Sequence, residues 1–389
     1  MPDGGRGTLA LVSAAIFAIV TSVTMMGPLL VDISRTFGVS LGAVGILSGA
    51  QSVTQALGSP FAGVVSDRLG RRPLIVLSLA GMGAMAVAAA AAPTFAALLI
   101  VRLLAGVFGA LGPTSLMASV GDLFAPARRT QAMGWFNMGF SFAAIAGVPA
   151  AGAIAGLWGW RWTFVAVGGQ LLVLSLAIRI WFPAPVLTPT DVGMLATYRE
   201  VWRERGLRSL LAANLIERSM FLMMTLYLPA FLMLGHAMSA LQVAPFLSVV
   251  ALGAIGGNLA GGWLGDRLPK AGVFVAAQTL AGGVASILFG AGLPLPIAVA
   301  FAALFGFANA SGRPPFLALS AEFAPRHRGA VFGLIAFTNQ SGLFLGASVG
   351  ALVIELGGYR PFAVVALAQG LLAAALLLPL LLRRPIPPI

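Results

Sequence analysis

Ionisable side chains are rare inside the long apolar stretches of this sequence, so the few that lie there are the first candidates for chemistry. Glu217 lies nine residues from the start of one such stretch (208–234), and Arg313 lies at a comparable distance, five residues, from the end of another (295–318). At about 1.5 Å per residue both would sit at a similar depth, so we expect them to form an ion pair. The pair is either purely structural or a site where the carboxylate takes up and releases a proton. Arg218 should project about 100° away from Glu217 on a helix, so we expect it to face elsewhere.

Asp32 and Arg102 are two further candidates for proton coupling, and they either pair with each other or leave Asp32 solvated. Uncharged polar side chains in the apolar stretches can bind a ligand or a neighbouring helix; they are Gln51, Gln55, Asn137, Gln170, Asn214, Asn258, Asn309, Asn339 and Gln340. The candidates for lining a substrate cavity are taken from the ionisable and the uncharged polar residues of the apolar stretches. They are Arg313, Arg218, Asn214, Asn309, Gln51 and Gln55.

The elements that position these residues are predicted to be membrane-spanning helices. The chain has 389 residues, of which 59% are hydrophobic and 9% charged, and its mean hydropathy is +0.98. Apolar runs of about 20 residues are long enough to cross a bilayer as helices. We therefore expect an all-α protein with twelve such helices, at residues 8–31, 41–63, 73–92, 95–119, 131–156, 162–182, 208–234, 240–264, 271–292, 295–318, 329–355 and 361–382.

The basic residues indicate how these helices are oriented. Of the 23 lysines and arginines, 17 fall at the termini and in loops on one side, three in loops on the other side and three in apolar segments. Positively charged loops stay in the cytosol, so we expect both termini there and a multi-pass protein of the plasma (inner) membrane, with an uncleaved first helix. This distribution argues against nucleic-acid binding. The chain has no cysteine and only two histidines, which makes a metal site improbable.

The sequence repeats itself at an offset of 199 residues. Asp67-Arg68 recurs as Asp266-Arg267, and residues 124–126 (Phe-Ala-Pro) recur at 323–325; Gly159 likewise matches Gly358. A parallel duplication is typical of transporters built from two related halves. We expect six-helix bundles at residues 1–182 and 208–389, related by a pseudo-two-fold axis along the membrane normal, with a cytosolic linker at 183–207.

Glycines at four-residue spacing, such as Gly253, Gly257 and Gly261, are expected to let helices approach closely. Close packing alone would explain them. A second interpretation is that these faces slide or rock between conformations.

The duplicated loop resembles the signature of the major facilitator superfamily. Residues 63–72 read Gly-Val-Val-Ser-Asp-Arg-Leu-Gly-Arg-Arg, and 262–270 read Gly-Trp-Leu-Gly-Asp-Arg-Leu-Pro-Lys. The resemblance covers the whole chain and implies a cytosolic latch between the halves. Its residues would be Asp67, Arg68, Arg71, Asp266 and Arg267. A carboxylate there can meet the positive end of a helix dipole.

Two further segments resemble the twelve-helix drug:proton antiporter group, and within it the sugar and metabolite efflux branch. Arg102-Leu103-Leu104-Ala105-Gly106 is similar to its fourth-helix motif, although Ala105 stands where glutamine is common. Residues 139–152 are similar to the fifth-helix antiporter motif but lack its paired glycines. The resemblance implies export, and it implies that helices one, four, seven and ten line the cavity.

These observations predict a secondary transporter rather than an enzyme. The sequence contains no Gly-x4-Gly-Lys-Ser/Thr loop, so we expect an ion gradient, most simply of protons, to drive transport without a cofactor. Three intramembrane arginines against Glu217 favour a small neutral or anionic organic substrate, exported by a monomer through alternating access. Proton-linked uptake of the same substrates is the alternative, and a membrane receptor that transports nothing is a third hypothesis.

Overall fold

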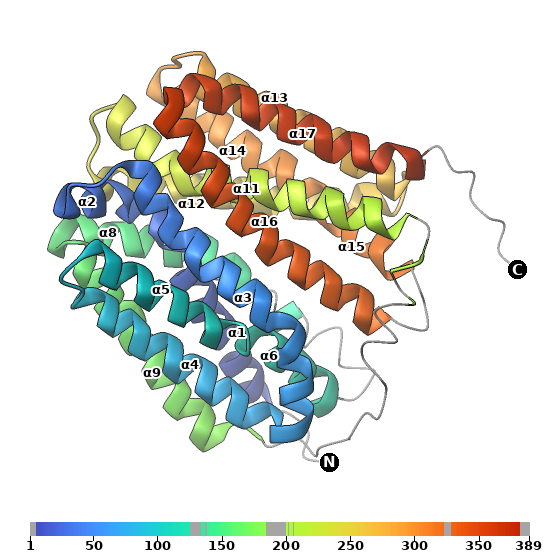
Figure 1. Ribbon diagram of the computed structural model, residues 1–389. Helices are drawn as coiled ribbons and strands as arrows, with labels where there is room; N and C mark the ends of the chain where they lie inside the picture. The colour runs from blue at the N-terminus through green and yellow to red at the C-terminus, as the bar shows by residue number, and fades with distance from the viewer. Residues whose placement is uncertain are drawn as a thin grey trace, which may run out of the picture. The chain divides into compact units, whose positions relative to one another are not determined.

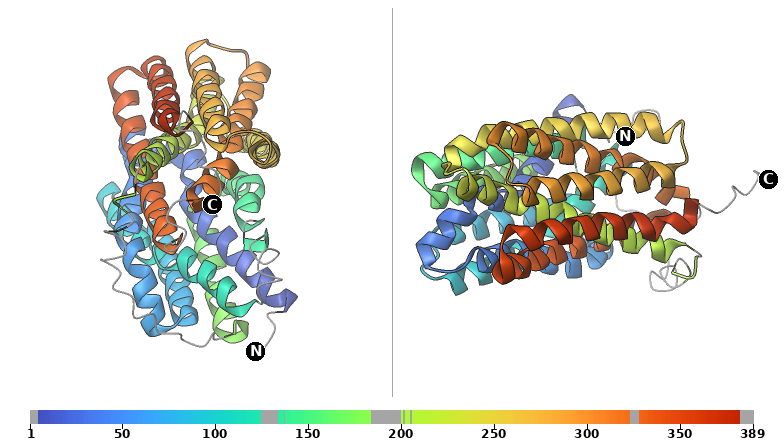
Figure 2. Two further views of the ribbon diagram at one scale, coloured as in Figure 1. Left: turned by 90° about the vertical axis from the view of Figure 1, so that its right-hand side faces the viewer. Right: turned by 90° about the horizontal axis from the view of Figure 1, so that it is seen from above.

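The computed structural model describes residues 5–124, 134–136, 138–183, 200, 202–204, 206–322 and 328–381. Within these ranges it describes all side chains except those of residues 63, 64, 66–68, 121, 122, 321 and 328–330. Figures 1 and 2 show helices joined by loops, and the described part of the chain contains no β-strand. Eleven of its helical stretches are long and apolar enough to cross a membrane. The predicted all-α membrane architecture is confirmed.

Each of the twelve predicted segments contains helix in the part that the structure describes. The helices of the first half are α1 (Arg6–Thr24), α2 (Met26–Phe37), α3 (Leu41–Leu69), α4 (Arg71–Ala90), α5 (Phe95–Gly109), α6 (Gly112–Leu123), the π-helix η1 (Ala143–Gly147), α8 (Val148–Trp158) and α9 (Trp160–Trp181). Those of the second half are α11 (Leu207–Gly235), α12 (Ala240–Gly265), α13 (Lys270–Gly290), α14 (Leu295–Ser311), α15 (Arg313–Glu322), α16 (Arg328–Gly357) and α17 (Tyr359–Leu381).

Helix α3 is long enough to span a bilayer, with 29 residues, but it is not among the eleven apolar spans. Its sequence explains the difference, because Gln51 and Gln55 interrupt the apolar run together with several serines, threonines and glycines. It is therefore the most polar of the twelve predicted membrane helices.

Three of the predicted helices are interrupted. The first divides at Met25 into α1 and α2, the fourth divides between Gly109 and Gly112 into α5 and α6, and the tenth divides at Gly312 into α14 and α15. Proline follows two of these interruptions, at Pro113 and at Pro314, where a missing N–H and a fixed φ suit the first turn of a helix.

The chain divides into two compact units. The first comprises Met1–Asp191 with Leu226–Ser248, and the second comprises Val192–Thr225 with Val249–Ile389. In the first unit α4 lies beside α9 and α3 beside α5 (Figure 1). A Cβ at Gly106 of α5 would overlap the carbonyl oxygen of Gln51, and Thr54 Oγ1 donates a 2.8 Å hydrogen bond to Leu103 O. The glycine thus brings α3 and α5 into backbone contact.

In the second unit α13 packs along α17 and α14 (Figure 1). The glycine series of α12 faces the backbone of α14: a Cβ at Gly253 would meet Ala303 O, one at Gly257 would meet Phe307 O, and one at Gly261 would meet Ser311 O. Close packing of the two backbones therefore accounts for the four-residue spacing.

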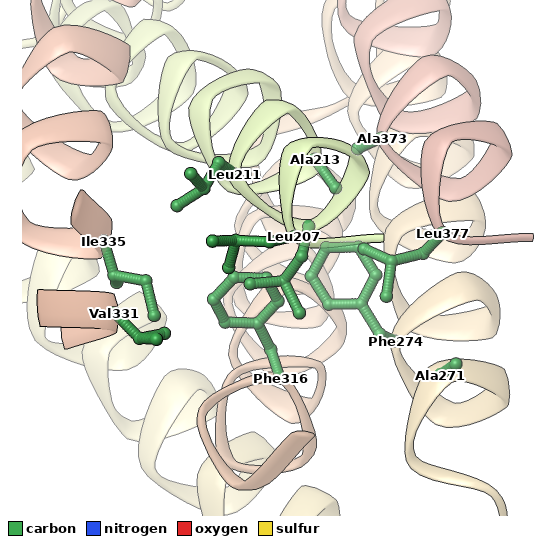
Figure 3. Packing of buried hydrophobic residues seen from close by; sticks show 11 residues of the cluster. Leu207, Leu211, Ala213, Ala271, Phe274, Phe316, Val331, Ile335, Ala373 and Leu377 are labelled. Carbon is green, nitrogen blue, oxygen red and sulfur yellow. The ribbon is translucent and has the colours of Figure 1, made fainter. Parts of the chain in front are cut away.

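An apolar cluster fills one end of the second unit (Figure 3). Phe274 of α13 and Phe316 of α15 lie with ring centroids 5.4 Å apart, and Leu207 of α11 is fully buried with them. Helices α11, α15 and α16, which contribute to this cluster, also carry charged and amide side chains that are described below.

The internal repeat has a counterpart in the backbone. Gly159 has a φ of 90° and its match Gly358 has a φ of 71°, and each turns the chain between two long helices. Such a conformation strains any residue with a Cβ, so the two matched glycines are required by the same turn in both halves.

Candidate functional site

The carboxylate of Glu217 lies on α11 with only 1% of its side chain exposed, and it binds two arginines. Arg218 donates from Nε to Oε2 at 2.5 Å and from Nη2 to Oε1. Arg313 of α15 approaches Oε2 with Nη1 at 3.5 Å. The structure thus contains the expected pair of Glu217 and Arg313. The expectation that Arg218 faces elsewhere is wrong, because its long side chain folds back across the helix surface onto the neighbouring carboxylate.

Arg313 is held mainly by uncharged groups. Its Nη1 donates to Oδ1 of Asn214 at 2.7 Å, and its Nη2 donates to Oδ1 of Asn339 at 2.8 Å. Asn214 is itself fixed, since its Nδ2 donates to Thr338 Oγ1 at 2.7 Å and to the carbonyl oxygen of Ile335 at 3.3 Å. Three helices, α11, α15 and α16, therefore hold one guanidinium in a defined orientation.

Two more amides hold the carboxylate from its other side. Asn309 of α14 donates from Nδ2 to Glu217 Oε1 at 3.0 Å and is also 3.2 Å from Oε1 of Gln278 on α13. Gln278 is fully buried and donates to Asn309 O at 3.4 Å. We call Glu217, Arg218, Arg313, Asn214, Asn309, Asn339 and Gln278 the polar cluster.

Charge and exposure differ within the polar cluster. One carboxylate faces two guanidinium groups, which leaves one net positive charge. The side chains of Arg218 and Arg313 are 16% and 17% exposed, against 1% for Glu217. A molecule that reaches the cluster therefore meets the edges of two cations before it meets the anion. An excess charge in a low-dielectric site attracts an ion of opposite sign.

In the first unit Arg102 is 2% exposed and donates to backbone carbonyls, to Ser22 O at 3.3 Å and to Leu47 O at 3.5 Å. No ion pair joins it to Asp32 within the described ranges. Gln55 donates to Gly109 O at 3.2 Å, whereas the amide of Gln51 is buried and has no hydrogen-bond partner among the residues that the structure describes. Among the described residues, no hydrogen bond or ion pair joins these four candidates to one another.

Asp32 lies instead in a hollow of about 400 Å³ in the first unit, lined by Arg35, Gly156, Gly159, Met238 and other residues. Its partial exposure agrees with the solvated alternative rather than with pairing to Arg102.

The latch residues are described only in part. The side chains of Asp67 and Arg68 lie outside the described residues, as does all of Asn137. Asp266 and Arg267 are exposed in the turn after α12, where the Arg267 guanidinium lies 4.1 Å from the ring centroid of Trp263. Arg71 is the first residue of α4. The latch remains a prediction.

Gln278 is a member of the polar cluster that sequence reasoning missed. An amide within an apolar stretch was a sufficient signal, because that same criterion selected Asn309 and Asn339. Only the structure could show that these amides converge on one carboxylate and one guanidinium.

Comparison with known proteins places this arrangement in a family. The profile of the Major Facilitator Superfamily matches residues 12–347 and 250–389. The chain belongs to this superfamily. It is a multi-pass membrane transporter and not an enzyme, and the predicted fold of two six-helix bundles is that of the family.

Three known proteins illustrate the similarity. The chain is 26% identical over 354 residues to the uncharacterized MFS-type transporter YceJ of Bacillus subtilis (strain 168), covering 88% of each chain. It is also 26% identical to monocarboxylate transporter 13 of Rattus norvegicus, covering 94% of this chain and 86% of that one. Among solved structures, an inward-facing, occupied bacterial homolog of the human lysosomal transporter Spinster aligns with a TM-score of 0.77 at 20% identity, covering 98% and 95% of the two chains.

Proposed function

We propose that this superfamily member is a proton-coupled secondary transporter that exports a small neutral or anionic organic molecule by alternating access. The observation that carries the proposal is the polar cluster, in which one buried carboxylate is shared between two arginines on different helices. Ionisable groups at such depth are costly, and in membrane proteins they mark substrate and proton pathways.

Glu217 is the proposed proton site. A carboxylate can change its charge by taking up a proton, whereas the guanidinium groups beside it stay protonated. Protonation of Glu217 would weaken its bonds to Arg218 and Arg313 and leave both cations free to bind another molecule. Proton uptake and substrate binding would then involve the same atoms.

The net positive charge of the cluster supports neutral or anionic substrates over cationic ones. The similarity to a protein named as a monocarboxylate transporter points the same way. Export is favoured by the resemblance of residues 139–152 to the antiporter motif. We further propose a monomer in the inner membrane. The distribution of basic residues supports placing both of its termini in the cytosol.

Purified protein in liposomes that contain a pH-sensitive dye would test the proposal. A panel of small sugars, nucleosides, carboxylates and carboxamides is added outside, with protein-free liposomes as the baseline. We expect at least one compound to cause a protein-dependent change of internal pH and to support counterflow. Counterflow without proton movement would contradict the coupling, and the absence of both would contradict transport of this substrate class. Proton-linked uptake, the second candidate, would differ from export in exchange for protons by the opposite direction of the substrate-driven pH change.

A further inference from the structure

The polar cluster indicates which substrates it takes and how their binding is coupled to the proton. We propose that it binds a carboxylate monoanion together with a proton on Glu217, so that an organic acid is moved with its own proton and no net charge. This inference rests on the proposed proton coupling at Glu217 and deepens it. Because the acid and the proton would move in the same direction, an inward proton gradient would drive the acid inward, so on the direction of transport the inference favours the second candidate, proton-linked uptake, over export.

Arg313 is preorganised to bind a carboxylate. Its short hydrogen bonds go to the neutral oxygens of Asn214 and Asn339, at 2.7 and 2.8 Å, whereas its contact with Glu217 is the longest, at 3.5 Å. Loss of the Glu217 contact would therefore leave the guanidinium in place. Its Nε makes no hydrogen bond to any described residue, so a donor remains on a fixed, planar fork that suits a carboxylate.

Arg218 is the second binding group, and it is bound differently. Both of its hydrogen bonds go to Glu217, and its guanidinium lies 4.6 Å from the ring centroid of Phe221. When Glu217 is protonated, Arg218 loses the one anionic partner that it has among the described residues, while the aromatic ring still supports it. A ligand carboxylate can then take the place that the Glu217 carboxylate held.

The charge balance of the cluster selects a monoanion plus one proton. The empty cluster holds one carboxylate and two guanidinium groups, and the loaded cluster would hold a neutral Glu217, two guanidinium groups and one ligand carboxylate. Both states carry one net positive charge, so binding of the anion with one proton leaves the net charge of the buried site unchanged. A neutral ligand would leave protonated Glu217 beside two uncompensated cations.

No other charged group is placed to change this balance among the described residues that surround Glu217. The charged groups that face it are Arg218 on its own helix and Arg313 on α15. Helices α13, α14 and α16 contribute only the neutral amides Gln278, Asn309 and Asn339, and Gln369 of α17 donates to Ser219 Oγ.

The sign of the coupling follows. Protonation of Glu217 removes the carboxylate that competes with the ligand for the two arginines. The bound anion in turn compensates the two cations that otherwise oppose protonation. Proton and anion therefore promote each other's binding. In an exchanger in which substrate and proton compete, each would weaken the other. By linkage, a monoanion that binds with one proton gains affinity by about tenfold for each unit of falling pH while Glu217 is ionised in the free protein.

Thermal unfolding of the purified protein with pairs of probes that share a shape but differ in charge tests the inference. The probes are lactate with lactamide and benzoate with benzamide, titrated at pH 6 and pH 8. We expect a carboxylate, but not its amide, to raise the unfolding temperature, with higher affinity at pH 6. Glu217→Gln imitates the protonated residue and should bind the carboxylate at pH 8 as wild type does at pH 6. Glu322→Gln, which removes an exposed carboxylate paired with Lys270, is the matched control and should behave as wild type.

Three results would overturn the inference: equal stabilisation by the amides, tighter carboxylate binding at pH 8, or no stabilisation by either carboxylate. The comparison of probe pairs in the wild-type protein decides the question even where Glu217→Gln fails to fold. A neutral probe that moves protons in the liposome assay would leave the proposed function standing while it rejects the monoanion. A carboxylate that is transported without protons would reject the proposed coupling itself.

Discussion

The carboxylate of Glu217 receives two hydrogen bonds from Arg218 and one, at 3.5 Å, from Arg313. The two cations are therefore not equivalent. Arg218 neutralises the carboxylate directly, whereas Arg313 is fixed by the side-chain oxygens of Asn214 and Asn339 and only approaches it. This asymmetry separates a cation held by the carboxylate from a cation held by neutral side chains.

Asn339→Ala tests whether Arg313 is held by its neutral partners. The substitution removes a 2.8 Å hydrogen bond to a charged donor, an interaction of about 1.5–3 kcal/mol. We expect a lower unfolding temperature and weaker ligand binding, because the guanidinium loses its fixed orientation. Asn258→Ala is the control, since Asn258 is exposed on α12 and donates only to Ala254 O of its own helix. Equal losses in both variants would contradict this role of Asn339.

Gly257→Ala tests the close contact between α12 and α14. Its new methyl group would overlap Phe307 O, and overpacking of this kind costs about 1–3 kcal/mol. Gly262→Ala, five residues on in the same helix, meets nothing within 4 Å and should be tolerated. The comparison is made by thermal unfolding in detergent. If Gly257→Ala were as stable as Gly262→Ala, the two backbones would not be in contact there.

The orientation in the membrane predicts opposite accessibility for two introduced cysteines. The native chain contains no cysteine, so Ser40→Cys and Thr190→Cys each provide a single thiol. Ser40 lies between α2 and α3, and Thr190 lies in the proposed cytosolic linker. An impermeant thiol reagent added to intact cells should label position 40 and should label position 190 only after lysis. Outside labelling of position 190 would reverse the assigned topology.

The sequence was sufficient to predict the helices and one ion pair. Apolar runs and charged loops located all twelve segments, and depth counting brought Glu217 and Arg313 together. Depth depends only on the rise per residue, which is nearly constant in helices. The matched glycines Gly159 and Gly358 share a positive φ because the repeated sequence builds the same turn twice.

The remaining features depend on side-chain reach and on neighbours distant in sequence. The expectation for Arg218 followed the direction of its Cα–Cβ bond, but a long flexible side chain can return to the carboxylate of the adjacent residue. The interruption of the first helix at Met25 was not predicted, although Pro28 follows it closely and has no N–H to bond the carbonyl oxygen of Thr24. The convergence of Asn309 and Gln278 on Glu217 requires knowing which helices pack together.

Proton movement by the Glu217→Gln variant tests the central claim most directly. In dye-loaded liposomes, wild type and the control Glu322→Gln should both move protons with the transported compound. Glu217→Gln should still exchange labelled for unlabelled compound across the membrane, because exchange needs the binding groups but not the proton. The account predicts that its substrate-driven pH change falls to the protein-free baseline. A substrate-driven pH change in Glu217→Gln equal to that of wild type would contradict the assignment of Glu217 as the proton site.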